Sequence, residues 1–192
     1  YRYLVLSDLY RVTGKLGFST LLKLLILGES YKYNFWMRTC LYLSGKPCLR
    51  YILYPFARFI LRRLRYRLGI SIPFNTPIGS GFYIGHFGGI VVNINSKIGK
   101  NCNISQGVTL GVANRGEKIG CPTLGDYVYI GPGAKIVGSV NVGNNVAIGA
   151  NCVVTDDIPD DSVVVGVPGK VISKNGSRGY VNKTDYENKI GI

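Results

Sequence analysis

The chain of 192 residues is long enough for one domain with a substantial extension. With 46% hydrophobic and 17% charged residues it can bury a core, which excludes a disordered protein, and its 26 glycines lack the every-third period of collagen. One histidine excludes a polyhistidine metal site, and five cysteines without a C-x-x-C pair exclude a zinc ribbon, so we expect reduced, buried thiols and no metal.

The first predicted element is a basic, helical N-terminal segment over residues 1–69. The net charge of +13 is concentrated here, because thirteen of the 23 Lys and Arg residues lie within the first seventy positions, against only Asp8 and Glu29. Apolar residues have helical spacing over 3–27 and 30–44. The sequence has no run of about 18 uncharged apolar residues, so we expect no transmembrane helix.

Aromatic, aliphatic and arginine residues interleave over residues 49–67. An amphipathic helix of this composition suits the interface of an anionic membrane, with arginines at the headgroups and aromatic rings below them. A helical trimerisation element with solvated arginines is an equally open alternative. Contact with nucleic acid is disfavoured, because no known binding module is present. We therefore expect a cytoplasmic protein, with the inner face of the cell membrane as an alternative location.

An aliphatic residue, usually followed by glycine, then recurs every six positions. Three such hexads complete a triangular turn of about eighteen residues, in which the aliphatic residue points inward and stacks on the next coil. The fixed period favours a parallel β-helix over residues 70–172, followed by a tail over 173–192, and disfavours an antiparallel sandwich. The repeating positions are Ile78, Ile84, Ile90, Ile98, Ile104, Leu110, Leu124, Ile130, Ile136, Val142, Ile148 and Val154.

Four motifs lie within these repeats: G-H-F-G-G-I-V-V over 85–92, I-S-Q-G-V-T-L-G over 104–111, I-G-P-G-A-K over 130–135 and G-V-P-G-K-V-I over 166–172. They resemble the motifs of hexapeptide-repeat acyltransferases, most of all the serine acetyltransferase branch. The resemblance covers about half of the chain. It implies a mainly β protein, a left-handed parallel β-helix with an α-helical extension, which assembles as a homotrimer and transfers acetyl from acetyl-CoA to a hydroxyl.

The one histidine, His86, occupies the position of the family's catalytic histidine. A hydroxyl is too weak an acid to ionise alone, so its attack on a thioester needs a general base near pKa 7. The resemblance therefore implies that His86 is this base, and that a backbone N–H of a neighbouring coil stabilises the oxyanion. The group that orients the imidazole stays open between a backbone carbonyl, Ser71, Asn75, Asn93 and no group at all.

Three departures from the serine acetyltransferase pattern bear on the acceptor. Gly85 stands where the family has an aspartate, Asn93-Ile94-Asn95 replaces a stretch with a glutamate, and Cys121-Pro122 replaces a second histidine. A zwitterionic amino acid needs such charges, so we expect a sugar rather than free serine. The predicted acceptor-binding residues are Asn93, Asn114, Arg115 and Cys121.

The repeat is interrupted between Leu110 and Leu124, which are fourteen positions apart where six are expected. This predicts a loop extruded from the coils at about 112–123. Loops on rigid scaffolds often carry functional residues. The polar side chains of this loop could make hydrogen bonds to a hydroxylated acceptor. A solvated loop with no function is an equally weighted alternative.

The resemblance also implies where acetyl-CoA binds. Small residues let the pantetheine arm lie in a groove between coils, and Lys170 is a candidate partner of a CoA phosphate, with an ordinary exposed lysine as the alternative. Direct transfer needs no covalent intermediate, so Cys121 is not expected to be a nucleophile. The predicted cofactor-binding residues are Gly111, Gly131, Pro132, Ala150, Asn151 and Lys170.

Together these observations predict an O-acetyltransferase that acts on a sugar in surface (capsular or exo-) polysaccharide biosynthesis. The form of the acceptor stays open between a nucleotide sugar, a lipid-linked unit and the finished polymer. The short basic segment also resembles polysaccharide O-acetyltransferases more than the acidic helical domain of serine acetyltransferases. Serine O-acetyltransferase is the alternative enzyme. A non-enzymatic β-helix is disfavoured, because no threonine or charge ladder runs along the coils.

Overall fold

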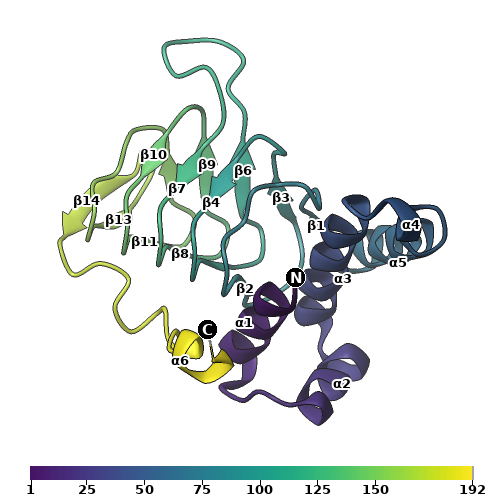
Figure 1. Ribbon diagram of the computed structural model, residues 1–192. Coiled ribbons are helices and arrows are strands. Elements are labelled where there is room, and N and C mark those ends of the chain that lie inside the picture. Colours follow the sequence, from purple (N-terminus) through teal and green to yellow (C-terminus); the bar gives the residue numbers. More distant parts are fainter. Residues whose placement is uncertain (192) are drawn as a thin grey trace.

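The computed structural model describes residues 1–191, apart from the side chain of Arg50. A stack of β-coils has a group of helices at one end, and the first and last helices of the chain lie side by side there (Figure 1). No described helix is both long enough and apolar enough to cross a membrane. The helices are α1 (Arg2–Thr13), α2 (Phe18–Leu27), α3 (Glu29–Ser44), α4 (Pro47–Arg50), α5 (Leu53–Leu68) and, after the coils, α6 (Tyr186–Ile190).

The predicted left-handed β-helix is confirmed. Short strands form three sheets whose neighbours are parallel, except that the last strand pairs antiparallel with the strand before it. The first sheet contains β1 (Ile70–Ser71), β3 (Ile90–Val92), β6 (Thr109–Gly111), β9 (Lys135–Val137) and β12 (Val153–Val154). The second contains β4 (Lys97–Ile98), β7 (Thr123–Leu124) and β10 (Asn141–Val142). The third contains β2 (Tyr83–Ile84), β5 (Asn103–Ile104), β8 (Tyr129–Ile130), β11 (Ala147–Ile148), β13 (Val163–Val165) and β14 (Lys170–Ser173).

The repeating aliphatic residues form the core of the coils. In the third sheet they stack in register, and each is at most 3% exposed. Burial of each such side chain contributes about 1.5–3 kcal/mol to the stability of the fold. The contacts that stabilise the coils therefore recur with the same six-residue period as the sequence. The stacked residues are Ile84, Ile104, Ile130, Ile148 and Val164.

The predicted helix over 3–27 is in fact two helices, α1 and α2. Gly14 ends α1 with φ 70° and Gly17 precedes α2 with φ 158°, so the chain turns between them. Glycine adopts the left-handed conformation at Gly14 without steric cost, which makes it a natural end for the helix. The helical spacing of apolar residues continues through this turn, so the sequence pattern does not reveal the break between the two helices. None of the residues of α2 is buried.

Buried polar groups fix the helices to the first coil. The carboxylate of Asp8 pairs with the Arg38 guanidinium at 3.0 Å, and both side chains are at most 2% exposed. Arg38 also donates to the carbonyl oxygens of Ile78 and Gly79, while Asp8 accepts from the Phe82 N–H. Burial raises the pKa of the Asp8 carboxyl, and Arg38 opposes this shift. The network therefore joins α1, α3 and the coils at one point.

The five cysteines are free, but they are not all buried as expected. Cys48 is exposed within α4, and Cys121 is half-buried at the base of the extruded loop. Cys40, Cys102 and Cys152 are buried, and burial raises the pKa of the Cys102 thiol to about 12. The exposed position of Cys48 arises because α4 lies at the surface of the helical group.

Replacing Gly79 by alanine is expected to lower the free energy of unfolding by about 1–3 kcal/mol. An added Cβ would lie 2.6 Å from both the carbonyl carbon of Gly99 and the amide nitrogen of Lys100, in the next coil. These are backbone atoms, which move only if the coils separate. Urea unfolding measures the change. Gly45→Ala is the control, because its Cβ would meet only the Tyr42 carbonyl oxygen, at 3.8 Å. Equal effects of the two substitutions would contradict the prediction.

Candidate active site

His86 lies in the turn between β2 and β3, at the corner that joins the third sheet to the first. Its side chain is exposed, and within residues 1–191 no side-chain hydrogen bond to its imidazole is present. Gly88 and Gly89 follow with φ of 108° and 64°, a conformation that suits glycine. The sequence therefore presents the imidazole on a tight turn that depends on its two glycines.

Successive coils place equivalent turns beneath His86. Gly107 donates to the Gly88 carbonyl at 2.7 Å, the turn of the next coil donates to the Gln106 carbonyl, and Asn151 donates to the Pro132 carbonyl at 2.8 Å. These bonds make one continuous column along the corner. Four of the residues predicted to bind acetyl-CoA lie in this column with His86: Gly131, Pro132, Ala150 and Asn151.

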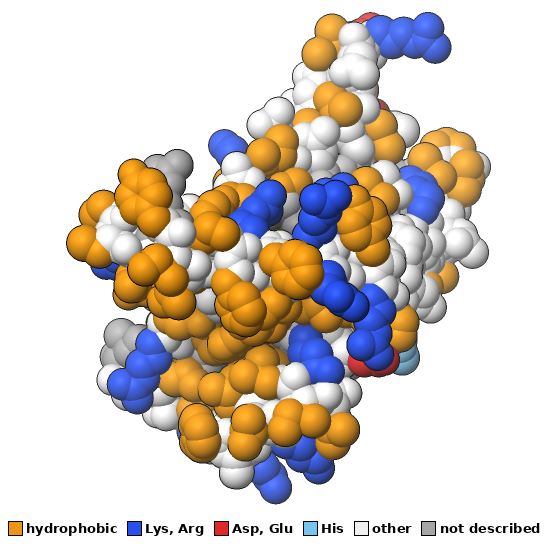
Figure 2. Space-filling model, turned by 90° about the vertical axis from the view of Figure 1, so that its right-hand side faces the viewer, with side chains coloured by type: hydrophobic (Ala, Val, Ile, Leu, Met, Phe, Trp, Pro, Cys, Tyr) orange, Lys and Arg blue, Asp and Glu red, His pale blue; other side chains and the backbone are white. Residues whose placement is uncertain are grey.

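Two hollows flank His86. One has a volume of about 210 Å³ and lies toward the junction of α2 and α3, where Glu29 and Ser30 form part of its wall. Figure 2 shows acidic atoms directly beside the pale blue histidine. Glu29 is the first residue of α3 and is exposed. A carboxylate that is remote in sequence therefore lies across a hollow from the imidazole.

The other hollow has a volume of about 400 Å³ and has basic groups in its wall, Arg11 and Lys183. Arg11 is buried; its Nε donates to the Gly81 carbonyl at 3.0 Å and its Nη2 contacts the Asn103 amide oxygen. Burial lowers the pKa of the Arg11 guanidinium. Lys183 is exposed and donates to the Val12 carbonyl at 2.9 Å.

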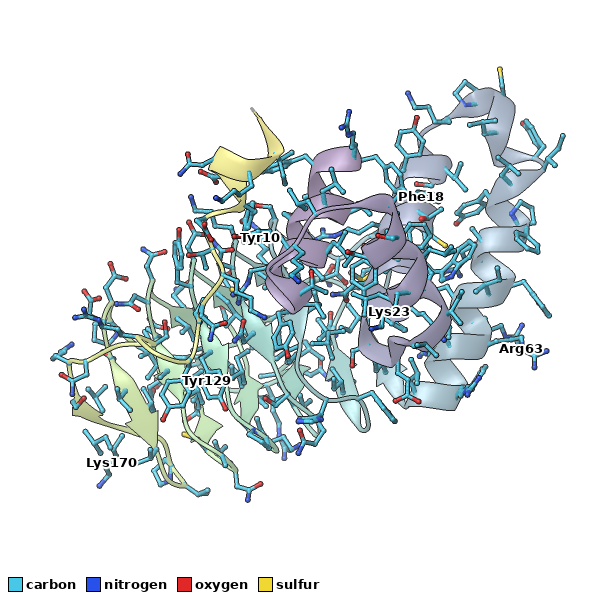
Figure 3. All side chains as sticks on the ribbon, turned by 90° about the horizontal axis from the view of Figure 1, so that it is seen from below. Tyr10, Phe18, Lys23, Arg63, Tyr129 and Lys170 are labelled. Atoms are coloured by element: carbon cyan, nitrogen blue, oxygen red, sulfur yellow. The ribbon has the colours of Figure 1, made fainter. Side chains whose placement is uncertain are left out.

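The chain after the coils completes this second hollow. The ring of Tyr180 stacks on Tyr129 with centroids 4.4 Å apart, and its carbonyl accepts from the Asn103 amide at 2.9 Å. Figure 3 shows Tyr129 on the coils, beneath the returning C-terminal segment. The segment that the sequence suggested only as a tail thus forms a wall of the His86 site.

The residues predicted to bind the acceptor lie at a different corner of the same chain. Asn93 follows β3, and its N–H donates to the Leu110 carbonyl at 2.9 Å. Gly111, predicted to bind acetyl-CoA, ends β6 at this corner, where the extruded loop begins. Asn114 and Arg115 are exposed on that loop, and Cys121 lies at its base. A single copy therefore does not bring these residues to His86.

The extruded loop leaves the coils as a hairpin and projects from the stack (Figure 1). Ala113 and Gly120 pair across it in antiparallel fashion. The ammonium of Lys118 lies 3.2 Å from the carboxylate of Asp157, whose pKa is lowered mainly by the Asn141 N–H and also by Lys118. Lys118 thus ties the loop to a neighbouring turn.

The candidates for orienting His86 are occupied or distant. The Ser71 hydroxyl accepts from Arg65 at 2.8 Å, Asn75 is exposed in the segment after β1, and Asn93 lies at the other corner. Lys170 begins β14, at the end of the coils opposite the helices (Figure 3). Across residues 1–191, no group of three or more His, Cys, Asp or Glu residues is arranged to hold a metal ion.

Residues 121–156 match the family model described as bacterial transferase hexapeptide (six repeats). The serine acetyltransferase of Bacillus subtilis is 42% identical over 125 residues, which are 65% of this chain and 58% of the relative. A crystal structure of Neisseria gonorrhoeae serine acetyltransferase in complex with serine is 31% identical, with a TM-score of 0.69 over 88% of this chain and 68% of that one. The chain belongs to the hexapeptide-repeat transferases.

A second structure in this family, the serine acetyltransferase of Brucella abortus in complex with coenzyme A, has a TM-score of 0.74 at 26% identity, over 91% of this chain and 68% of that chain. The chain spans 58% of the length of the curated Bacillus relative. The prediction of a saccharide acceptor in polysaccharide biosynthesis is wrong, because the relatives of this hexapeptide-repeat transferase are serine acetyltransferases in both sequence and structure.

The physical reason for this error lies in the helices and the C-terminal segment. The expectation of a sugar rested on charges missing from the coils at Gly85, Ile94 and Cys121. Charged groups reach the His86 corner from elsewhere, with Glu29 in one hollow and Lys183 in the other. A count of charges along the repeats therefore underestimates the polarity of the site.

Proposed function

We propose that this chain is an acetyl-CoA-dependent O-acetyltransferase whose acceptor is serine, and that His86 is its general base. The observation that carries the proposal is the similarity to serine acetyltransferases, which covers 88% of this chain in the serine complex. The exposed imidazole on a glycine-rich turn, beside two hollows with opposite charges, agrees with this chemistry.

In the proposed reaction the His86 imidazole takes the proton of the serine hydroxyl while the oxygen attacks the thioester carbonyl carbon. The C–O bond forms, and the carbonyl oxygen becomes an oxyanion that accepts a hydrogen bond from a backbone N–H of an adjacent coil. The oxyanion collapses, the C–S bond breaks, and the leaving CoA sulfur takes the proton from the imidazolium. The products are O-acetylserine and CoA, and His86 returns to its initial state.

The charges around His86 support a zwitterionic acceptor. Glu29 would pair with the ammonium group of serine on one side of the imidazole, and Lys183 with its carboxylate on the other. Arg11 contributes positive charge beneath the same hollow. These residues take the place of the charged groups that the coils lack.

The column of turns below His86 would hold acetyl-CoA. Its exposed residues Ala150 and Asn151 are small, so an extended pantetheine arm can approach the coils closely. Assembly as a homotrimer would bring the other corner of a second copy, with Asn93, Arg115 and Cys121, toward the His86 corner of the first. In that arrangement the extruded loop covers the acceptor of its neighbour.

The test is CoA release from acetyl-CoA by the purified protein, followed with a thiol reagent. Serine is the acceptor to be offered first, with threonine, homoserine and glucosamine in parallel. Turnover that requires serine supports the proposal. Binding of acetyl-CoA without release in the presence of serine would exclude this acceptor, and failure to bind acetyl-CoA would exclude the activity itself.

Replacing Glu29 by glutamine is expected to raise the KM for serine about 10-fold or more, because a charge-assisted hydrogen bond contributes about 1.5–3 kcal/mol. Lys183→Met should have a similar effect by removing the partner of the carboxylate. Initial rates against serine concentration measure both, and the KM for acetyl-CoA should not change. Glu187→Gln, also an exposed acid but outside both hollows, is the control. An unchanged KM for serine in both variants would show that these residues do not contact the acceptor.

A further inference from the structure

Helix α5 has an outer face that is both aromatic and basic. Its inner face packs on the core through Ala57, Leu61 and Leu68. On the opposite side Phe56, Phe59 and Tyr66 are 60%, 57% and 72% exposed. Helical spacing places these three rings on one ridge. Such a row of exposed aromatic rings is unusual on the surface of a soluble domain and indicates a binding surface.

Arginines flank this ridge on both sides. Arg58, Arg62 and Arg65 line one flank and Arg63 and Arg67 the other, and all five are exposed. The Arg63 guanidinium lies 5.9 Å from the Phe59 ring centroid, and Arg62 lies at the same distance from Tyr66. Figure 3 shows Arg63 on the side of α5 that points away from the coils. Rings and guanidinium groups therefore share one outward surface.

This surface carries no balancing negative charge. The sequence has no Asp or Glu between Glu29 and Glu117. Among the described residues, the ion pairs involve Arg38, Lys100 and Lys118 and none of the arginines of α5. Figure 2 shows Lys and Arg side chains between hydrophobic ones across the helical face, with very little acidic surface. Because the positive charge of these arginines is not compensated within the described residues, the surface favours an anionic partner.

Three of the arginines also border a hollow. Arg58, Arg62 and Arg65 line a cavity of about 490 Å³ between α5 and the segment after β1. The Arg58 guanidinium lies 4.8 Å from the ring centroid of Phe74, which forms the opposite wall. Three guanidinium groups on successive turns of one helix, beside an open hollow, suit a phosphodiester group.

We propose that the outer face of α5 is a docking surface for an anionic phospholipid membrane, which holds headgroup phosphates with its arginines and inserts Phe56, Phe59 and Tyr66 at the interface. An amphipathic helix in the plane of the membrane binds in this way, by burying apolar side chains while basic residues contact anionic lipids. This inference does not depend on the acceptor of the acetyl group.

A second copy of the chain fits this surface less well. Two identical faces in a symmetric contact would place the arginines of one copy opposite those of the other. With no acid in α4 or α5 to offset them, this contact would be repulsive. Charge complementarity therefore favours the membrane.

The experiment is co-sedimentation of the full chain with vesicles of phosphatidylcholine alone and of phosphatidylcholine containing phosphatidylglycerol. We expect binding to the anionic vesicles only, and a decrease as salt is raised. Arg58→Gln/Arg62→Gln should weaken binding about 30-fold, and Phe56→Ser/Phe59→Ser should weaken it as well. Lys97→Gln/Arg178→Gln removes the same charge from exposed positions on the coils and after them, and should have much less effect. Circular dichroism checks that each variant is folded.

Three results would overturn the proposal. The first is equal binding to both kinds of vesicle, and the second is equal loss in the control variant. The third is absence of vesicle binding together with a change of oligomeric state in Phe56→Ser/Phe59→Ser by sedimentation equilibrium, which would assign the face to a second copy. A calorimetric titration with glycerol 3-phosphate in the absence of vesicles distinguishes membrane binding from a site for a free phosphate ester. Only the latter would bind this compound without vesicles.

Discussion

Replacing His86 by alanine is expected to lower kcat about 10²–10⁴-fold, which is the usual contribution of a general base. The loss follows because no other described side chain at this turn can take the proton of the acceptor hydroxyl, and a hydroxyl does not ionise alone at neutral pH. The imidazole is exposed and makes no side-chain hydrogen bond within residues 1–191, so we expect its removal to leave the coils intact. CoA release with saturating serine measures the effect, while acetyl-CoA binding should be unchanged.

Rescue by added imidazole distinguishes a base from a packing residue. The hollows on both sides of His86 leave room for a small molecule to enter the alanine variant. We expect imidazole to restore part of the activity in proportion to its concentration. Asn175→Ala, at an exposed position after β14, is the control and should keep full activity. A decrease of less than tenfold in kcat, or no rescue despite intact acetyl-CoA binding, would contradict the role of a base.

Replacing Asp8 by alanine is expected to lower the free energy of unfolding by about 3–5 kcal/mol, the largest effect on stability that we predict. The substitution leaves the Arg38 guanidinium buried without its counter-charge and removes an acceptor for the Phe82 N–H. A typical domain is stable by only about 5–15 kcal/mol, so much of the stability would be lost. Urea unfolding at fixed protein concentration measures this change.

The double variant Asp8→Leu/Arg38→Met tests the cause. With both charges removed, no ion remains buried without a partner, so the double variant should be more stable than Asp8→Ala. Ser162→Ala, which truncates a buried residue among the coils, is a control for the loss of neutral, partly buried hydroxyl hydrogen bonding and should cost much less. A loss below about 1 kcal/mol in Asp8→Ala would mean that the pair does not hold the helices on the coils.

The coils were predictable because one rule governs them. A single aliphatic position per hexad must point inward, so the phase from Leu124 to Val154 predicts the strands and the core together, whereas the left hand of the coils was implied only by the family resemblance. The same arithmetic identifies corners: two positions after the inward residue come His86, Gln106, Pro132 and Ala150, which all lie in one column. One hexad after His86 comes Val92, and Asn93 follows it directly at the end of β3, so the same arithmetic already separates Asn93 from the His86 corner.

The rest of the site could not be predicted in this way. Glu29 and Lys183 approach His86 because α3 and the C-terminal segment dock on the coils, and this docking depends on contacts that have no period. The buried pair of Asp8 and Arg38 is one of these contacts, and a stretch rich in charge gives no sign that it is buried. The error about the acceptor has the same origin, since it considered charges on the coils alone, and Glu29 and Lys183 line the hollows beside His86 from outside the coils.

The stack of coils also has two ends, and each is closed. At one end α3 and α5 pack against β2 and β1, and at the other β14 pairs with β13 in the antiparallel direction. An open parallel edge would offer unpaired backbone groups to the edge of another molecule, and a stack of identical coils could then continue from one molecule to the next. The reversal of β14 breaks this match. The reversed strand therefore opposes end-to-end growth of a self-complementary scaffold along the third sheet.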